Sequence, residues 1–253
     1  MNWTHIILEA LGTCVLILMG CGVNAGASLN KSKSKGAGWL TVNWGWGIAV
    51  FSGVLVAAKS GGHLNPAVTV GMLVAQKDIG GVAASAGGAY YGEAVGYIVA
   101  QFIGAFIGAA LVWLAYKKQF DENQDNGVRL GVFSTGPEVR STGWNLVTEA
   151  IGTFVLVFVV LISGYQGNAS NLGWLNALGV AILIVGIGAS LGGPTGYAIN
   201  PARDLGPRLW HAVMPCPGKD GNNWGYSWIP VVGPILGAIV AALVFIVTKS
   251  VYA

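Results

Sequence analysis

The sequence predicts an all-α membrane protein with six transmembrane helices and two re-entrant half-helices, arranged as an inverted repeat. Its composition, the length of its apolar segments and a motif that occurs twice predict this fold. Of the 253 residues, 54% are hydrophobic and 9% are charged, whereas soluble domains average about 25% charged residues. The net charge of +3 comes without a strong basic cluster, so we expect the lipid bilayer, and no nucleic acid, as a partner.

Six apolar segments are long enough to cross the hydrocarbon core, which is about 30 Å thick and needs roughly 20 helical residues. Each is expected to be a helix, because an open sheet would leave unpaired backbone groups in lipid. The first segment has no Lys or Arg before it and is as long as a full span, which indicates a retained helix instead of a signal peptide. In chain order, the segments lie at approximately 4–24, 39–58, 93–116, 144–164, 173–191 and 229–248.

Two shorter apolar segments, at 65–75 and 200–210, begin with the same tripeptide, Asn65-Pro66-Ala67 and Asn200-Pro201-Ala202. Asn is a favoured N-cap because its side-chain oxygen accepts a hydrogen bond from the first helical turn, and Pro suits the next position. One such tripeptide would indicate a helix start and nothing more. Two copies in matching places, each too short to span and each after a Gly-rich stretch, indicate paired half-helices at a pore.

A second motif also repeats. Glu9-Ala10-Leu11-Gly12-Thr13 matches Glu149-Ala150-Ile151-Gly152-Thr153 at an offset of 140 residues, and the two Asn-Pro-Ala motifs are 135 residues apart. Unrelated motifs that recur at nearly one spacing indicate an internal duplication. Each half has an odd number of spans, so the copies cross the membrane in opposite directions. We expect one channel domain over 1–253, with repeat one at about 1–116, a connecting surface loop at about 117–143 and repeat two at about 144–253.

Glu9 and Glu149 are the acidic residues well inside the predicted spans, where an ionisable group is costly and becomes a functional candidate. Because they hold equivalent places in the two repeats, the favoured interpretation is structural. Each carboxylate would accept hydrogen bonds from the irregular backbone before its half-helix. The alternative is a carboxylate that couples transport to protons.

The sequence contains residue types that catalysis and metal binding use, but their spacing does not match a catalytic or metal-binding motif. Cys14, Cys21 and Cys216 have neither metal nor redox spacing, and no nucleophile has a general base at a matching spacing. We therefore expect no cofactor, no metal and no enzymatic activity. His63, beside the first half-helix, is interpreted as a hydrogen-bonded loop residue, with a pH sensor as the alternative.

Taken together, these motifs resemble the aquaporin superfamily, the major intrinsic proteins, over nearly the whole chain. Within it, the chain is similar to the aquaglyceroporin branch, which includes the bacterial glycerol facilitators, because Asp204 follows Arg203. The stretches that carry the resemblance are Glu9-x-x-Gly12-Thr13, Gly61–Thr69, Phe133-Ser134-Thr135, Glu149-x-x-Gly152-Thr153 and Gly196–Asp204.

The resemblance implies a homotetramer with one pore per subunit, in the plasma or inner cell membrane, with both termini cytoplasmic. The charges argue for the opposite topology. The segments that would then be cytoplasmic hold only Lys59, Lys77 and Lys249, while the other ten basic residues lie on the opposite side. The resemblance decides for cytoplasmic termini.

The resemblance also implies the parts of a pore. Asn65 and Asn200 are expected at the membrane midplane, where their NH2 groups would donate to passing hydroxyls. The selectivity filter is expected at Trp46, Gly188, Tyr197 and Arg203. Backbone carbonyls that replace the hydration of the solute are expected at Gly61, Gly62, His63, Leu64, Ala198 and Ile199. Structural support is expected from Glu9, Glu149, Asp204, Pro66, Ala67, Pro201 and Ala202.

Two departures from the family pattern affect the filter. Trp44 competes with Trp46 for the filter wall, because selecting Trp46 needs a one-residue deletion in the alignment. Tyr197 stands where bacterial glycerol facilitators often have Phe, and its hydroxyl would make the filter more polar or narrower.

These expectations favour a passive channel for glycerol and other small uncharged solutes that also passes water and excludes ions and protons. Urea, hydrogen peroxide and protonated lactic acid are further candidate solutes. One alternative is a water-selective pore, which Gly188 argues against because the water-selective branch has a bulky His there. The other is a proton-coupled small-solute transporter, whose coupling would need Glu9 or Glu149.

Overall fold

A computed structural model describes residues 1–163, 173–216 and 218–252 and is almost entirely helical, with one isolated β-bridge in this part of the chain. Five of its helices are long and apolar enough to cross a membrane. A sixth, α8, has 17 residues, or about 26 Å of helix. The six are α1 (Trp3–Ser28), α2 (Gly38–Val56), α4 (Gly88–Ala115), α7 (Thr142–Ser163), α8 (Leu175–Leu191) and α10 (Ile229–Tyr252).

These helices match the six predicted spans, although the last residue of the predicted span 144–164 lies outside the described residues. The start of α4 differs most, since the helix begins at Gly88 and not at 93. Glu93, the first residue of the predicted span, is fully buried within α4, where a carboxylate oxygen accepts a 2.7 Å hydrogen bond from the backbone N–H of Asn2. A buried acid with a partner does not end a helix.

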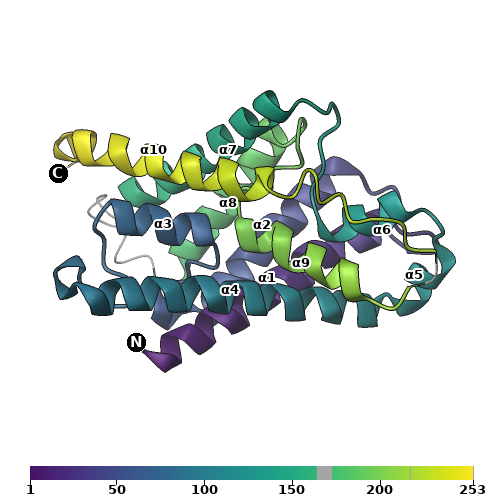
Figure 1. Cartoon of the computed structure of the whole chain (residues 1–253), viewed down its shortest axis with the longest axis horizontal. Helices are drawn as coiled ribbons and strands as arrows, with labels where there is room; N and C mark the ends of the chain where they lie inside the picture. The colour runs from purple at the N-terminus through teal and green to yellow at the C-terminus, as the bar shows by residue number, and fades with distance from the viewer. Residues whose placement is uncertain (164–172, 217, 253) are drawn as a thin grey trace.

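The two half-helices are present and both are capped as the sequence predicts. Asn65 is the N-cap of α3 (Pro66–Val74), and Asn200 is the N-cap of α9 (Pro201–Val213). The second continues to Val213, three residues beyond the predicted end. In Figure 1 they lie end to end across the middle of the molecule, among the long helices. Pro66 and Pro201 occupy the first helical position, and Ala67 and Ala202 are fully buried behind them.

Helix packing follows the predicted duplication. The most extensive contacts join α1 to α4 in the first half and α7 to α10 in the second. Each half-helix also packs on the last long helix of the other half, α3 on α10 and α9 on α4. The half-helices are therefore exchanged between the repeats, and the surfaces around their N-terminal ends come from both.

Two glycines allow the closest helix crossings. A Cβ atom on Gly104 would fall on the carbonyl oxygen of Ala10, and a Cβ on Gly237 would fall on that of Ala150. Ala10 and Ala150 are 140 residues apart, the same offset as the duplicated Glu motif. Small residues let helix backbones approach in membranes, and here the same device serves both halves.

The connecting segment departs from the predicted surface loop. It contains α5 (Lys117–Glu122) and α6 (Asn126–Phe133), and Phe120, Arg129 and Phe133 are fully buried. The Phe120 and Phe133 rings stack with their centroids 5.4 Å apart. The segment has many charged residues, but a few of its side chains pack onto α1 and α9. Part of it therefore belongs to the packed structure. Two short 3-10 turns, η1 (Ala58–Ser60) and η2 (Ala84–Ala86), complete the described elements.

The outer surface is suited to lipid. Along α4, Val95, Val99 and Ile103 are each more than half exposed, and Leu243 of α10 is 52% exposed. Soluble monomers rarely expose a continuous band of large apolar side chains. The start of α1 and the end of α10 lie toward the same end of the molecule, on the left in Figure 1.

Candidate functional site

The two half-helices meet at their N-terminal ends and are bonded to each other there. The Asn65 Nδ2 group donates to the carbonyl oxygen of Ile199 at 2.8 Å, and the Asn200 Nδ2 group donates to that of Leu64 at 2.9 Å. Each Asn thus binds the residue that precedes the other Asn. The sequence predicts a free NH2 group, but one of its two hydrogens is already used, and one remains for a molecule in the pore.

Asn65 and Asn200 also keep their capping bonds. The Asn65 side-chain oxygen accepts from the backbone N–H of Ala67 at 2.9 Å, and the Asn200 oxygen accepts from Ala202 and Arg203 at 3.0 and 3.2 Å. With both ends of each amide engaged, the two side chains are fixed. The positive ends of two helix dipoles then face one region.

Glu9 holds the backbone that leads to the first half-helix. One carboxylate oxygen accepts from the N–H of His63 at 3.0 Å and from the hydroxyl of Ser60 at 2.7 Å, and the other accepts from the N–H of Leu64 at 2.8 Å. The side-chain NH2 of Gln101 donates to the same second oxygen at 2.8 Å. Glu9 is fully buried. Its bonds to Ser60, His63 and Leu64 hold the loop, and its bond to Gln101 ties it to α4.

Glu149 makes the equivalent contacts in the second repeat. Its two carboxylate oxygens accept from the N–H groups of Ala198 and Ile199 at 3.0 and 2.8 Å. In both repeats, the buried carboxylate accepts hydrogen bonds from the backbone just before the half-helix, which is the arrangement that a structural role requires.

These carboxylates determine where the loop carbonyls point. In a planar trans peptide, the carbonyl on the same unit points away from the N–H. The N–H groups of His63 and Leu64 point to Glu9, so the carbonyls of Gly62 and His63 point away from it. By the same reasoning, the carbonyls of Tyr197 and Ala198 point away from Glu149.

All six residues predicted to supply carbonyls, together with Asn65 and Asn200, line one cavity of about 140 Å³. Its remaining wall is mostly aliphatic, with Val50, Val54 and Ile184 among the contributors. The loop backbone is strained where it lines this cavity. Leu64, Tyr197 and Ile199 have positive φ angles of 52°, 38° and 45°; a non-glycine residue in this region costs about 1–3 kcal/mol and needs its surroundings to hold it.

A second, larger cavity of about 530 Å³ lies next to the first. Three side chains line both cavities, namely Trp46, Tyr197 and Arg203, and we call them the junction residues. Each is at most 7% exposed. The guanidinium of Arg203 lies over the Trp46 ring, 4.1 Å from its centroid, and its Nη1 donates to the carbonyl of Phe133 at 3.1 Å. Arg203 is therefore fixed by an aromatic face and a carbonyl.

The position of the two tryptophans of α2 distinguishes them. Trp46 is 5% exposed, and its indole N–H donates to the side-chain oxygen of Asn24 at 3.1 Å. Trp44 is 45% exposed and lies on the outer surface, in a groove with Met19 and Leu40. The structure thus places Trp46, and not Trp44, beside Arg203.

Gly188 does not line either of the two cavities. It lies behind Tyr197, where an added Cβ would be 2.7 Å from the Cζ atom of that ring. The absence of a side chain at Gly188 makes room for the tyrosine. The predicted set of four filter residues is therefore three lining side chains and one glycine that accommodates one of them.

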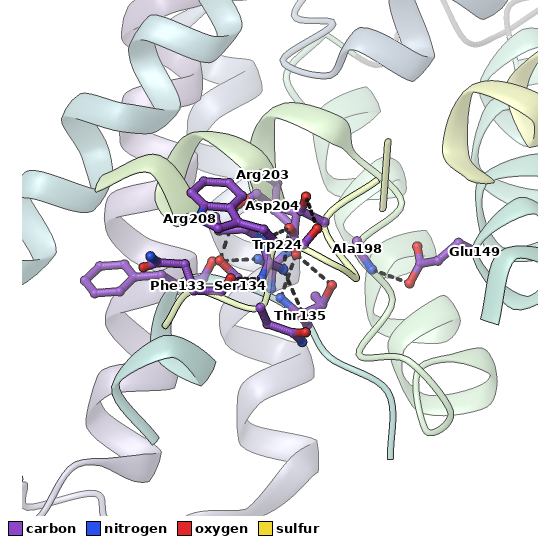
Figure 2. Close-up of polar contacts among 12 residues, drawn as sticks. Phe133, Ser134, Thr135, Glu149, Ala198, Arg203, Asp204, Arg208 and Trp224 are labelled. Atoms are coloured by element: carbon purple, nitrogen blue, oxygen red, sulfur yellow. Dashed lines mark hydrogen bonds and ion pairs between the residues drawn. The ribbon is translucent and has the colours of Figure 1, made fainter. Parts of the chain in front are cut away.

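Asp204 does not pair with the neighbouring Arg203. Its carboxylate accepts from the N–H and hydroxyl of Thr135, both at 2.7 Å, and from Nε and Nη2 of Arg208 at 2.9 and 2.7 Å. Arg208 also donates to the Thr135 carbonyl at 3.0 Å. Figure 2 shows this network beside the Phe133 carbonyl that Arg203 binds. Asp204 thus holds the segment that positions Arg203.

His63 has the contacts of a loop residue. Its Nδ1 lies 3.1 Å from the Thr69 hydroxyl, and its ring meets the Tyr97 ring edge to face at 5.2 Å. The roles of Thr135, Arg208 and Gln101 were not found from the sequence. Of these contacts, only the pair of Asp204 and Arg208 could be anticipated, because opposite charges four residues apart on one helix can form an ion pair.

An assembly of membrane-crossing helices around two adjacent cavities, with paired half-helices contributed by two inverted repeats, is a membrane channel. Residues 1–245 match the Major intrinsic protein family, and the chain belongs to this family. The fold is the aquaporin fold, as the solved structure described next also indicates.

The chain is similar to several curated proteins over nearly its whole length. It is 48% identical over 238 residues to a glycerol uptake facilitator protein of Streptococcus pneumoniae, covering 94% of this chain and 96% of that protein. It is also 48% identical over 240 residues to a probable glycerol uptake facilitator protein of Thermotoga maritima, covering 94% and 97%. The X-ray structure of the aquaglyceroporin from Plasmodium falciparum superimposes with a TM-score of 0.82 at 29% identity, covering 99% of both chains.

Proposed function

We propose that this protein is a passive channel for glycerol and other small uncharged solutes, that it also passes water, and that it excludes ions and protons. The observation that carries the proposal is the junction between the two cavities, where the aromatic rings of Trp46 and Tyr197 lie beside the guanidinium of Arg203. The similarity to glycerol uptake facilitator proteins supports glycerol as the first solute.

A linear polyol has a face of CH groups and a face of hydroxyls. At the junction residues, the CH face would slide along the rings while the hydroxyls accept from the Arg203 guanidinium, which has several donors. Deeper in the pore, the remaining hydrogens of the Asn65 and Asn200 amides donate to hydroxyl oxygens. The loop carbonyls then accept from the hydroxyls, so hydration is replaced one group at a time.

Ions would meet two barriers. Arg203 places a fixed positive charge at the junction, and the two half-helices direct their positive dipole ends at the next region of the pore. A neutral solute crosses both fields without charge repulsion. We propose Trp46, Tyr197 and Arg203 as the selectivity filter, with Gly188 accommodating Tyr197 and Asp204 holding the outer segment.

The alternatives have less support. The water-selective pattern has a bulky His at position 188, whereas here position 188 is Gly and the space beside it is occupied by the Tyr197 ring and Asn43. A proton-coupled transporter would need a carboxylate free to titrate, whereas Glu9 and Glu149 are each committed to backbone N–H groups. We propose that the protein has no catalytic activity. Urea, hydrogen peroxide and protonated lactic acid, which are small and uncharged, are further proposed solutes.

We also propose a homotetramer with one pore per subunit, in the plasma or inner cell membrane, with both termini cytoplasmic. The start of α1 and the end of α10 lie toward one end of the molecule, which supports placing both termini on one side. Within the chain, we propose repeat one over about 1–116 and repeat two over about 144–253, joined by the connecting segment.

Stopped-flow light scattering on proteoliposomes tests the proposal. An impermeant osmolyte reports water flow, and re-swelling in a glycerol gradient reports glycerol entry, both measured from pH 5 to pH 8 against protein-free liposomes. We expect fast re-swelling at every pH, because no proton moves with the solute. Fast water flow without glycerol entry would favour the water-selective pore, and glycerol entry that depends on a proton gradient would favour the transporter.

A further inference from the structure

We infer that Asn43, in the second turn of α2, is a positioning residue for solute selection, because its amide holds the hydroxyl of Tyr197 and thereby sets where the ring stands in the pore. This inference rests on the proposed filter and adds a residue to it. Asn43 is fully buried and lines neither cavity. It would therefore act on the solute only through Tyr197.

The contacts of the Asn43 amide define this role. The indole N–H of Trp39 and the backbone N–H of Ala189 lie 3.1 and 3.2 Å from one end of this amide, and two facing donors assign the oxygen to that end; the nitrogen at the other end then donates to the Tyr197 hydroxyl at 2.8 Å. The Trp39 N–H is also shared with the carbonyl of Gly188 at 3.1 Å. One amide thus joins α2, α8 and the loop that carries Tyr197.

The Tyr197 ring is held on several sides. Gly188 lies directly behind it, and the Trp39 ring meets it edge to face, with centroids 5.7 Å apart. Its backbone is strained, with φ at 38°, so local conformation does not favour this placement. The hydroxyl bond to Asn43 fixes the far end of the ring, where a small tilt would move it into the pore.

This arrangement changes the expected effect of a tyrosine at this position. The sequence suggests that the hydroxyl makes the filter more polar or narrower. In the structure, the hydroxyl is turned toward the protein wall formed by Asn43 and Gly188. The pore is therefore lined by the apolar ring, and the hydroxyl serves as an anchor.

Removing one partner of the hydrogen bond should be disruptive, whereas removing both should be nearly neutral. Asn43→Leu keeps a similar volume but leaves the Tyr197 hydroxyl without a partner, and a buried unpaired hydroxyl is costly. The ring would then rotate so that its hydroxyl can form a hydrogen bond with water in the pore. Combining Asn43→Leu with Tyr197→Phe replaces both partners by apolar groups, which is close to neutral in comparable cases. The double variant should recover what the single variant loses.

The experiment measures the ratio of glycerol to water permeability, and of erythritol to glycerol permeability, in proteoliposomes. It uses the wild type, both single variants and the double variant. Thr41→Val is the matched control, since Thr41 lies on the same helix, is exposed and donates its hydroxyl to the carbonyl of Ala37. A change in folding or yield alters all fluxes together, whereas a displaced ring alters their ratio.

We expect Asn43→Leu to change the glycerol-to-water ratio by about two- to tenfold, the range spanned by one such hydrogen bond. Thr41→Val should leave it unchanged, and the double variant should return it toward the wild-type value. An unchanged ratio in Asn43→Leu, or an equal change with and without Tyr197→Phe, would overturn the inference. If wild-type protein passed no glycerol, the proposed function would fail independently of Asn43.

Discussion

Arg203 carries a full positive charge on a side chain that is almost entirely buried. It is stabilised by the Trp46 ring, the Phe133 carbonyl and the partial opening toward both cavities. Because Asp204 is bonded to Arg208 and Thr135, the charge of Arg203 is not cancelled by its neighbour. A charge that is positioned but not neutralised can act on whatever enters the junction.

Replacing Arg203 by Val should therefore let cations or protons through while glycerol and water still pass. At 4 Å and an effective dielectric constant of about 20, two unit charges repel by about 4 kcal/mol, so we expect at least about a tenfold rise in proton leak. A pH-sensitive dye inside liposomes held at a fixed membrane potential measures it. Arg140→Val removes an exposed cation and should leave the leak at the wild-type level. An unchanged leak in Arg203→Val would assign the barrier to the half-helix dipoles alone.

At the residue scale, the sequence was most informative where a motif repeats. The Asn caps, both Glu residues and Arg203 all lie at the cavities or hold the loops that line them. The sequence did not identify Asn43, and it gave Thr135 only within the Phe133-Ser134-Thr135 stretch and without its role, because the partners of both residues are distant in the chain. Asn43 meets Tyr197 only after folding brings α2 against the loop before α9, and Thr135 meets Asp204 only when the connecting segment packs on α9. No local pattern marks such pairs.

At the scale of elements, the helix crossings at Gly104 and Gly237 test whether the two repeats are built alike. Val at either position would push a side chain into a backbone carbonyl, and overpacking of this kind costs about 1–3 kcal/mol or more. We expect both variants to lower the thermal stability in detergent by similar amounts. Gly92→Val is the matched control on α4, since nothing lies within 4 Å of a Cβ there, and it should cost little. A large loss for one crossing alone would contradict the equivalence of the repeats.

The elements also show where prediction from sequence ends. Long apolar segments and two capped tripeptides were enough to predict the spans and the half-helices, since length and capping are local properties. The connecting segment was predicted as a surface loop, yet it contains α5 and α6. Its buried side chains, Phe120, Arg129 and Phe133, are too few and too widely spaced to produce an apolar run. Their burial depends on α1 and α9, which the segment itself does not reveal.

At the scale of the whole molecule, the two repeats should respond alike to loss of their buried carboxylates. Glu9→Gln and Glu149→Gln each replace a carboxylate oxygen, which accepts from an N–H, by an NH2 group that cannot accept. Hydrogen bonds to charged groups contribute about 1.5–3 kcal/mol, so we expect each variant to be destabilised by about 2 kcal/mol, with water and glycerol flux reduced together. Thermal unfolding and stopped-flow rates measure both effects.

Glu122→Gln is the control for this comparison, because Glu122 forms an exposed ion pair with Lys31, and such pairs contribute little to stability. A loss of proton-driven uptake in Glu9→Gln or Glu149→Gln, with stability intact, would instead assign the carboxylates to coupling.

The paired bonds from Asn65 to Ile199 and from Asn200 to Leu64 have a mechanical consequence. Each bond crosses from one repeat to the other at the centre of the pore, so rocking one repeat against the other would break both bonds at once. Proteins that expose their site alternately to the two sides of a membrane depend on such rocking, and their transport rate is limited by it. Here the centre of the molecule is a rigid aperture. The number of solutes that cross in a second should therefore rise in proportion to the concentration difference, with no turnover of the protein to limit it.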